Sequence, residues 1–153
     1  MNKIFYVIAS SAMIFMFSFT VAAQDNSVAD NIIGEYFVSH QGENSKVRIF
    51  KDLDDTYTVQ VFWVENCLDK KGEVRLDANN PDKSLRKTPC DQIILIKGLT
   101  YDSKKQRWGD AKIYDPTRGI RANVSCEFQD GGVLKVKGTL ACFSQSVYWK
   151  KIL

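Results

Sequence analysis

Apolar and polar side chains alternate along most of the chain after Ile32, as they do in strands with one buried face. The alternation is clearest in residues 120–128, "IRANVSCEF", and in residues 133–140, "VLKVKGTL". The sequence "QDGG" separates these two segments, which predicts a hairpin that turns at residues 130–132. The same pattern predicts six further strands, over residues 33–38, 46–51, 56–64, 92–99, 108–114 and 147–152.

Eight short strands joined mostly by tight turns indicate an all-β fold. No long helical period interrupts them. Because strands that are consecutive in sequence usually lie side by side, we expect a single antiparallel up-and-down barrel of about eight strands. This barrel is predicted to be one domain over residues 24–153.

The connection over residues 65–92 is long for a compact domain. Asn80 followed by Pro81 is typical of a helix N-cap and first helical position, so one helical turn is predicted over residues 81–86. Long loops often carry function, and they also occur as surface decoration. Both interpretations of this loop stay open.

The segment "DPTRG", residues 115–119, raises the question of an active-site loop. Asp115 can accept hydrogen bonds from the loop amides, Pro116 fixes a negative φ, and Gly119 supplies the positive φ that ends the turn. We therefore interpret the segment as a structural turn between two strands. Arg118 alone is free to face a partner.

The N-terminus is typical of a cleaved signal peptide. Lys3 precedes an apolar run over residues 4–21, and the small residues Val21 and Ala23 favour cleavage after Ala23. No basic stop-transfer cluster follows, which argues against a membrane anchor. We expect residues 1–23 to be removed, leaving a mature chain without a transmembrane segment, in the periplasm or secreted.

Charge and residue types argue against several function classes. The chain carries a formal charge of +3 and no basic stripe, so nucleic acid is not an expected partner. The one histidine, His40, lies in a polar stretch that is typical of a turn, and we expect neither a metal nor another cofactor. No nucleophile motif surrounds His40, so the protein is predicted not to be an enzyme.

Four cysteines remain after export, in a compartment where disulfides can form. Cys67 follows the third predicted strand and Cys90 precedes the fourth, so neighbouring strands would bring them to one rim as a disulfide. Mirroring the hairpin about its turn places Cys126 opposite Lys135, too far from Cys142 for a bond. Cys126 and Cys142 are expected to be free and buried.

Seven short features follow one another along the chain: "IIGEY", "SKVRIF", "IILIKGL", Trp108, "IYDPTRG", "LKVKGTL" and "YW" at residues 148–149. In this order the chain resembles the exported bacterial proteins grouped as domain of unknown function 2147. The resemblance implies a small calycin-like or lipocalin-like barrel and no established activity. "GEY" is similar to the G-x-W that opens lipocalin barrels, which implies that Tyr36 closes the barrel floor with Trp149 as a neighbour.

Two non-catalytic functions stay open. The first is an envelope accessory or interaction protein, and the alternative is a lipocalin-like binder of a small apolar or amphipathic ligand; a monomer is expected in either case. The residues that favour a binder are Tyr57 and Trp63, which share one face of the third strand, together with Arg118. If that face points inward, it lines a cavity beneath the loop over residues 65–92; otherwise the same side chains fill the core.

Overall fold

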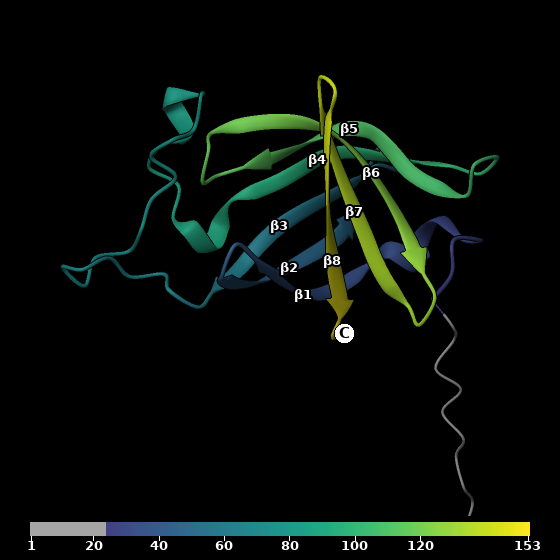
Figure 1. Cartoon of the computed structure of the whole chain (residues 1–153), viewed down its shortest axis with the longest axis horizontal. Helices are drawn as coiled ribbons and strands as arrows, with labels where there is room; N and C mark the ends of the chain where they lie inside the picture. The colour runs from purple at the N-terminus through teal and green to yellow at the C-terminus, as the bar shows by residue number, and fades with distance from the viewer. Residues whose placement is uncertain (1–23) are drawn as a thin grey trace, which may run out of the picture.

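The computed structural model describes residues 24–153, which form a closed barrel of eight antiparallel strands in chain order (Figure 1). This architecture confirms the predicted fold class; the predicted signal segment, residues 1–23, lies outside the described residues. The strands are β1 (Gly34–His40), β2 (Glu43–Lys51), β3 (Tyr57–Val64), β4 (Ile94–Asp102), β5 (Arg107–Asp115), β6 (Ile120–Gln129), β7 (Val133–Leu140) and β8 (Phe143–Lys151).

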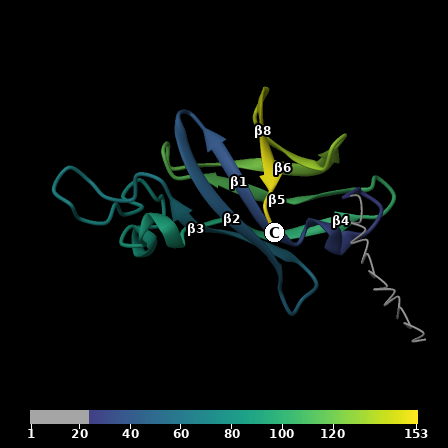
Figure 2. The same cartoon turned by 90° about the horizontal axis from the view of Figure 1, so that it is seen from below.

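The up-and-down order gives the barrel two different ends. The β2–β3, β4–β5 and β6–β7 turns lie at one end, together with the 3₁₀ helix η1 (Ala29–Ile32). The other end carries the remaining turns and the long β3–β4 loop. Figure 2 shows η1 and this loop on opposite sides of the barrel. We call these the closed end and the open end.

The residues that precede β1 plug the closed end. Asn26 pairs with the backbone of Phe128, donating to its carbonyl at 3.0 Å and accepting from its amide at 2.6 Å. Three buried aromatic side chains hold this plug, residues 26–32, by donating hydrogen bonds to it. Without these bonds their polar atoms would be buried with no hydrogen-bond partner. The Tyr36 hydroxyl donates to the Ile32 carbonyl (2.7 Å), the Tyr57 hydroxyl to the Asp30 carboxylate (2.5 Å) and the Trp108 indole to the Ala29 carbonyl (2.9 Å).

Tyr36 occupies the floor of the barrel, as the "GEY" motif implies. Its side chain is fully buried, and its ring centroid lies 6.3 Å from that of Trp149, which is also buried. Burial raises the pKa of the Tyr36 phenol. The predicted pairing of Tyr36 with Trp149 is confirmed.

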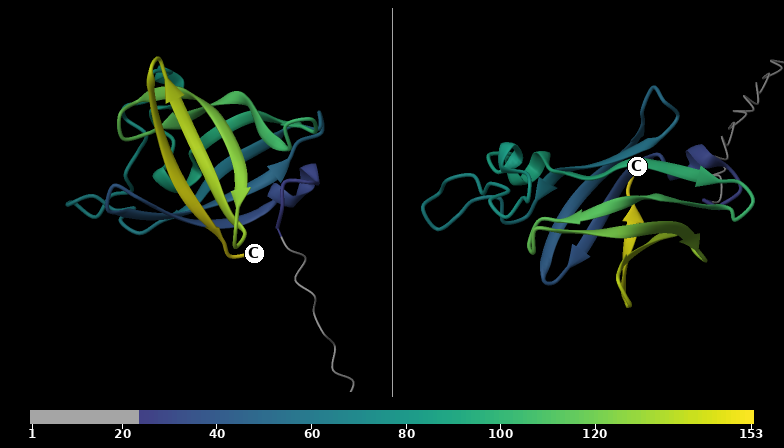
Figure 3. Two further views of the ribbon diagram at one scale, coloured as in Figure 1. Left: turned by 45° about the vertical axis from the view of Figure 1, so that its right-hand side comes forward. Right: turned by 90° about the horizontal axis from the view of Figure 1, so that it is seen from above.

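The barrel closes between β1 and β8 along only part of their length. The register joins Tyr36 to Lys151 and Phe37 to Lys150, whereas β8 pairs with β7 from Val133 to Leu140. Toward the open end β8 stands away from β1 (Figure 3). We call this partly unpaired junction the seam.

A bulge in β3 changes which side chains face inward. Lys46 pairs with Trp63 but the next residue, Val47, pairs with Val61, so Phe62 is an extra residue. An extra residue reverses the alternation beyond it. Trp63 is therefore 38% exposed on the outer face, 5.1 Å from the Lys46 ammonium, while Val64 is buried. The prediction that Trp63 faces the barrel interior is wrong.

Several element boundaries also differ from the prediction: β2 begins three residues earlier and β4 ends three residues later. β8 begins at Phe143 instead of residue 147; its first residues, "FSQS", have no buried apolar face and so give no strand signal in the sequence. The helical turn is η2 (Lys83–Leu85), and its N-cap is Asp82, whose carboxylate accepts from the Ser84 amide. Asn80 is not the cap because its side chain is buried against Asp77. A second 3₁₀ turn, η3 (Cys90–Gln92), precedes β4.

Among residues 24–153, no helix has the length and hydropathy needed to cross a bilayer.

Candidate functional site

A cavity of about 980 Å³ occupies the open half of the barrel. Large buried side chains, among them Trp108 and Tyr57, occupy the closed half, so this cavity does not extend through the barrel. Ala122 and Gly138 face the hollow half with little or no side chain and leave its volume unfilled. Apolar residues from seven strands and from the segment before β4 line the walls, among them Val38, Val61, Ile93, Leu95, Ile113, Ala122, Val136, Val147 and Trp149.

The β3–β4 loop, residues 65–92, covers part of the cavity mouth. Residues 73–79 of this loop line the cavity together with Asp69 and Cys90. The loop is the teal segment that extends away from the barrel in Figure 1. This confirms the prediction that the long loop lines the open end.

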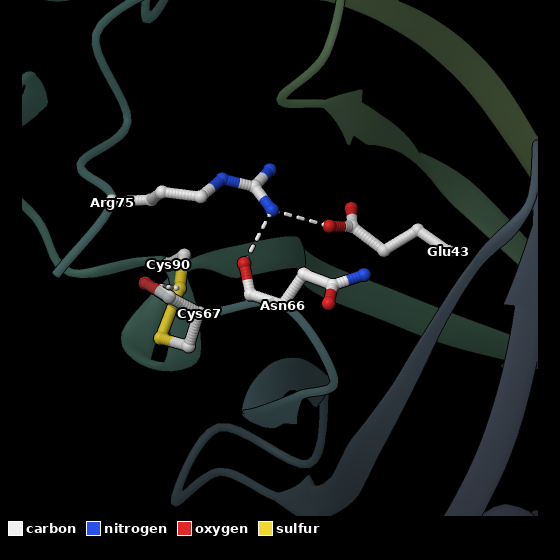
Figure 4. The surroundings of a disulfide bond; sticks show 5 residues. All are labelled: Glu43, Asn66, Cys67, Arg75 and Cys90. Atoms are coloured by element: carbon white, nitrogen blue, oxygen red, sulfur yellow. Dashed lines mark hydrogen bonds and ion pairs between the residues drawn. A yellow bond between two sulfur atoms is a disulfide. The ribbon is translucent and has the colours of Figure 1, made fainter. Parts of the chain in front are cut away.

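The first anchor of the loop is the Cys67–Cys90 disulfide, whose Cα atoms lie 6.2 Å apart. It confirms the predicted bond. Beside it, the Arg75 guanidinium pairs with the Glu43 carboxylate of β2 and donates to the Asn66 carbonyl at 2.6 Å (Figure 4). The disulfide thus joins the two ends of the loop, and Arg75 fastens its middle to β2.

The second anchor is the Asp77 carboxylate, which is only 3% exposed. It accepts from the Tyr114 hydroxyl at 2.7 Å and from the Asn80 side-chain amide at 2.6 Å. Burial, and after it the hydrogen bond to Asp77, raises the pKa of Tyr114. Asn79 adds a hydrogen bond to the Thr117 carbonyl at 3.1 Å. The loop thus spans the mouth from β3 to the β5–β6 turn.

Asp77 is a key residue of the site that the sequence does not reveal. In the sequence it is one of six acidic residues in a loop that also has six basic ones, and nothing local distinguishes it. Only the tertiary contact with Tyr114, 37 positions away, shows its role.

The β5–β6 turn has the predicted conformation. The Gly119 amide donates to the Asp115 carbonyl at 2.8 Å, and Gly119 has a φ of +66°. The Asp115 carboxylate accepts from the Thr117 amide at 2.9 Å. Arg118, however, is not free: its Nε lies 3.0 Å from the Asp115 carboxylate, and its guanidinium donates to Gln145 of β8 at 3.3 Å.

Of the three residues predicted to bind a ligand, the structure brings only Arg118 to the cavity. Tyr57 lies in the filled half, 1% exposed and bonded to the plug. Trp63 lies on the outer face, turned away by the bulge in β3. The aromatic residues that do line the cavity are Tyr114, Phe143 and Trp149, of which Trp149 was expected only as a neighbour of Tyr36 in the floor.

Cys126 and Cys142 are free, as predicted, but they differ in exposure. Cys126 is buried, which raises the pKa of its thiol to about 12. It lies opposite Val136, because a three-residue turn shifts the predicted register by one position. Cys142 lies in the β7–β8 turn and is exposed, so the prediction that both are buried is wrong for Cys142. The described part of the chain contains no group of His, Cys, Asp and Glu arranged to hold a metal ion.

Comparison with solved structures finds the same architecture in a protein from Helicobacter pylori, described as "Protein HP1028 from the human pathogen Helicobacter pylori belongs to the lipocalin family". The match covers 79% of this chain and 82% of that chain, with a TM-score of 0.62 and 18% sequence identity. At this identity the likeness concerns the fold alone. None of the curated proteins compared with the chain matches it significantly.

Residues 34–151 match the model of one protein family, described as "Uncharacterized protein conserved in bacteria (DUF2147)". The match runs from the first residue of β1 to the last residue of β8 and so includes the whole barrel. The chain therefore belongs to the bacterial family DUF2147.

Proposed function

We propose that this protein binds a small apolar or amphipathic molecule in the open-end cavity and does not catalyse a reaction on it. The observation that carries the proposal is the cavity of about 980 Å³ with apolar walls. Sites for small organic ligands are concave, mostly apolar and of roughly 300–1,000 Å³. An eight-stranded barrel whose interior is not filled by side chains has room for one such ligand.

The non-catalytic part of the proposal is supported by the residues at the cavity. His40 lies at the rim, and within residues 24–153 no serine, threonine or cysteine side chain is hydrogen-bonded to it. Nucleophilic catalysis needs a nucleophile next to a base. The acidic residues at the mouth are instead used largely in anchoring the loop and the β5–β6 turn.

We further propose that the mature protein is an exported monomer that begins at Gln24. The signal-like N-terminus supports export, and a disulfide suits an oxidising compartment. N-terminal sequencing of native protein is expected to return Gln24 or a near neighbour. Sequencing that returned Met1 would refute the export proposal.

Tryptophan fluorescence can test the binding proposal because the three tryptophans lie in different places. Trp149 lines the cavity, Trp108 is buried at the closed end, and Trp63 is on the outer face. Titration with fatty acids, alkyl glycosides and other envelope lipids is expected to give a saturable change. That change should survive Trp63→Phe and Trp108→Phe and be lost in Trp149→Phe.

A variant that fills the cavity provides a second measurement. Ala122→Phe adds a large apolar side chain at a wall position, so it should abolish binding measured by calorimetry while the barrel remains folded by circular dichroism. Binding that is unaffected by Ala122→Phe would place the ligand elsewhere. No saturable signal with any lipid class would refute the binding proposal.

A second candidate function is docking of a protein partner, and the β7–β8 hairpin favours it. Phe143 is 78% exposed and lies opposite Leu140, which is 48% exposed, at the tip of this hairpin beside the cavity mouth. Exposed apolar side chains that lie together often mark contact sites. If no ligand binds, a partner captured from the cell envelope by the native protein and lost in Phe143→Ser would support this alternative.

A further inference from the structure

We propose that the ligand of the open-end cavity is an amphiphile with a positively charged head group. This inference rests on the binding function proposed above and names the chemical class of the ligand. The apolar walls would take the hydrocarbon part, and the charges at the mouth would select the head.

The charged groups at the cavity are mostly acidic. Two guanidinium groups, of Arg75 and Arg118, face five carboxylates, which gives a balance of minus three around the cavity. The chain as a whole carries a formal charge of +3. The cavity mouth therefore has the opposite sign to the rest of the protein. The five carboxylates belong to Glu43, Asp69, Glu73, Asp77 and Asp115.

The β3–β4 loop separates its charges between its two sides. It has six acidic and six basic residues, yet it contributes three carboxylates and one guanidinium to the cavity. That guanidinium, of Arg75, is already paired with Glu43. The five basic residues that do not line the cavity are Lys70, Lys71, Lys83, Arg86 and Lys87. A loop with no net charge thus presents a negative surface to the ligand.

The three carboxylates of the loop, those of Asp69, Glu73 and Asp77, make no ion pair with any described residue. Asp77 supports the inference most strongly, because it is 3% exposed and both of its hydrogen-bond partners, Tyr114 and Asn80, are uncharged. Neutral donors satisfy its hydrogen bonds without cancelling its charge. In a poorly hydrated place an uncancelled charge acts strongly on a second charge nearby.

A positively charged head group at the mouth would supply the missing opposite charge. A carboxylate or phosphate head in the same position would be repelled and would also lose hydration on entry. An uncharged head would experience neither effect. The expected order of affinity is therefore cationic, then neutral, then anionic.

Three probes that share one dodecyl chain test this order: dodecyltrimethylammonium, dodecyl maltoside and dodecanoate, each below its micelle-forming concentration. Affinity is measured by displacement of N-phenylnaphthylamine, which is uncharged at neutral pH. We expect the cationic probe to bind about tenfold more tightly than the anionic one, equivalent to about 1.4 kcal/mol. This preference should shrink when salt is added, because exposed charges are screened.

Variants identify the groups responsible. Asp69→Asn/Glu73→Gln removes two exposed loop carboxylates at the cavity and should weaken binding of the cationic probe about fivefold while leaving dodecyl maltoside unchanged. The matched control, Asp110→Asn/Asp130→Asn, changes the net charge equally at exposed positions outside the cavity. It should leave all three affinities unchanged.

The possible failures are distinguishable. If the three probes bind equally, or dodecanoate binds best, the head-group inference is wrong and the binding function stands. If the control variant weakens the cationic probe as much as the loop variant does, net charge and not the mouth explains the preference. If no probe displaces the dye and no saturable signal appears by calorimetry, the binding function and this inference both fail.

Discussion

At the scale of single residues, Gly119 connects the β5–β6 turn to the loop across the cavity mouth. It has a positive φ of +66°, and a Cβ atom there would overlap the Asn79 carbonyl oxygen. Gly131, in the β6–β7 turn, has a φ of +80° but open space around it. Substitutions at the two glycines can therefore be compared to separate the cost of backbone strain from the cost of steric overlap.

Gly119→Ala is expected to lower the free energy of unfolding more than Gly131→Ala does. Strain from the left-handed backbone should cost about 1 kcal/mol in both variants, and displacement of Asn79 should add about 1 kcal/mol or more in Gly119→Ala. Urea denaturation measures both. Arg118→Ala should cost less than about 1 kcal/mol, because its ion pair with Asp115 is half exposed. Equal losses in the two glycine variants would show that the contact with Asn79 is unimportant.

The two free cysteines should differ sharply in reactivity. Burial raises the pKa of the Cys126 thiol to about 12, so at pH 8 this thiol is protonated and inaccessible, whereas Cys142 is exposed. Brief treatment of the native protein with iodoacetamide, followed by peptide mass spectrometry, is expected to find Cys142 modified and Cys126 unmodified. Both should react after unfolding in denaturant. Rapid modification of Cys126 in the folded protein would contradict its place in the core.

At the scale of elements, the disulfide and the Asp77 contact divide the anchoring of the β3–β4 loop between two points. The double variant Cys67→Ser/Cys90→Ser should lower the free energy of unfolding by about 3 kcal/mol, because the bond closes a loop of 23 residues that would otherwise be unrestrained in the unfolded chain. Cys142→Ser is the matched control and should leave stability unchanged. A denaturation midpoint that is the same with and without the bond would refute this expectation.

Most strands could be predicted from the sequence because their buried faces follow a strict period of two. The prediction failed where the backbone departs from that period, as at Phe62, where one extra residue turns Trp63 outward. It also failed at the start of β8, whose polar residues carry no periodic signal. Both departures affect the candidate site, since they decide which aromatic residues reach the cavity.

The site itself was harder to predict than the strands. The disulfide followed from strand order, but the contact of Asp77 with Tyr114 depends on how a long loop crosses the barrel mouth. No local pattern encodes such a crossing. The cavity likewise depends on Ala122 and Gly138 facing the same space from neighbouring strands, which requires the register and not only the composition.

At the scale of the whole molecule, the closed end should respond to acid through Asp30. A hydrogen bond from the Tyr57 hydroxyl, and then the Lys51 ammonium, lowers the pKa of the Asp30 carboxyl. Because the folded-state pKa lies below the unfolded one, this carboxylate stabilises the fold above pH about 4. That contribution is lost as the pH falls through the folded-state pKa.

Asp30→Asn should therefore melt at a lower temperature than the native sequence at pH 7, and the difference should narrow as the pH falls below about 4. Thermal denaturation followed by circular dichroism across this range measures the effect. Asp130→Asn, an exposed position in the β6–β7 turn, is the control and should follow the native curve. A difference that stays constant with pH would show that the Asp30 carboxylate has no special role in attaching the plug.

The short pairing between β1 and β8 has a consequence for how the closed sheet opens. Two residue pairs join these strands, and beside them Glu35 exchanges backbone hydrogen bonds with Ile152 and Leu153. Each other pair of neighbouring strands shares a longer ladder. Because local opening begins where the fewest contacts hold a structure, the seam is where the sheet is expected to part first, leaving a curved eight-stranded sheet whose hairpins are intact.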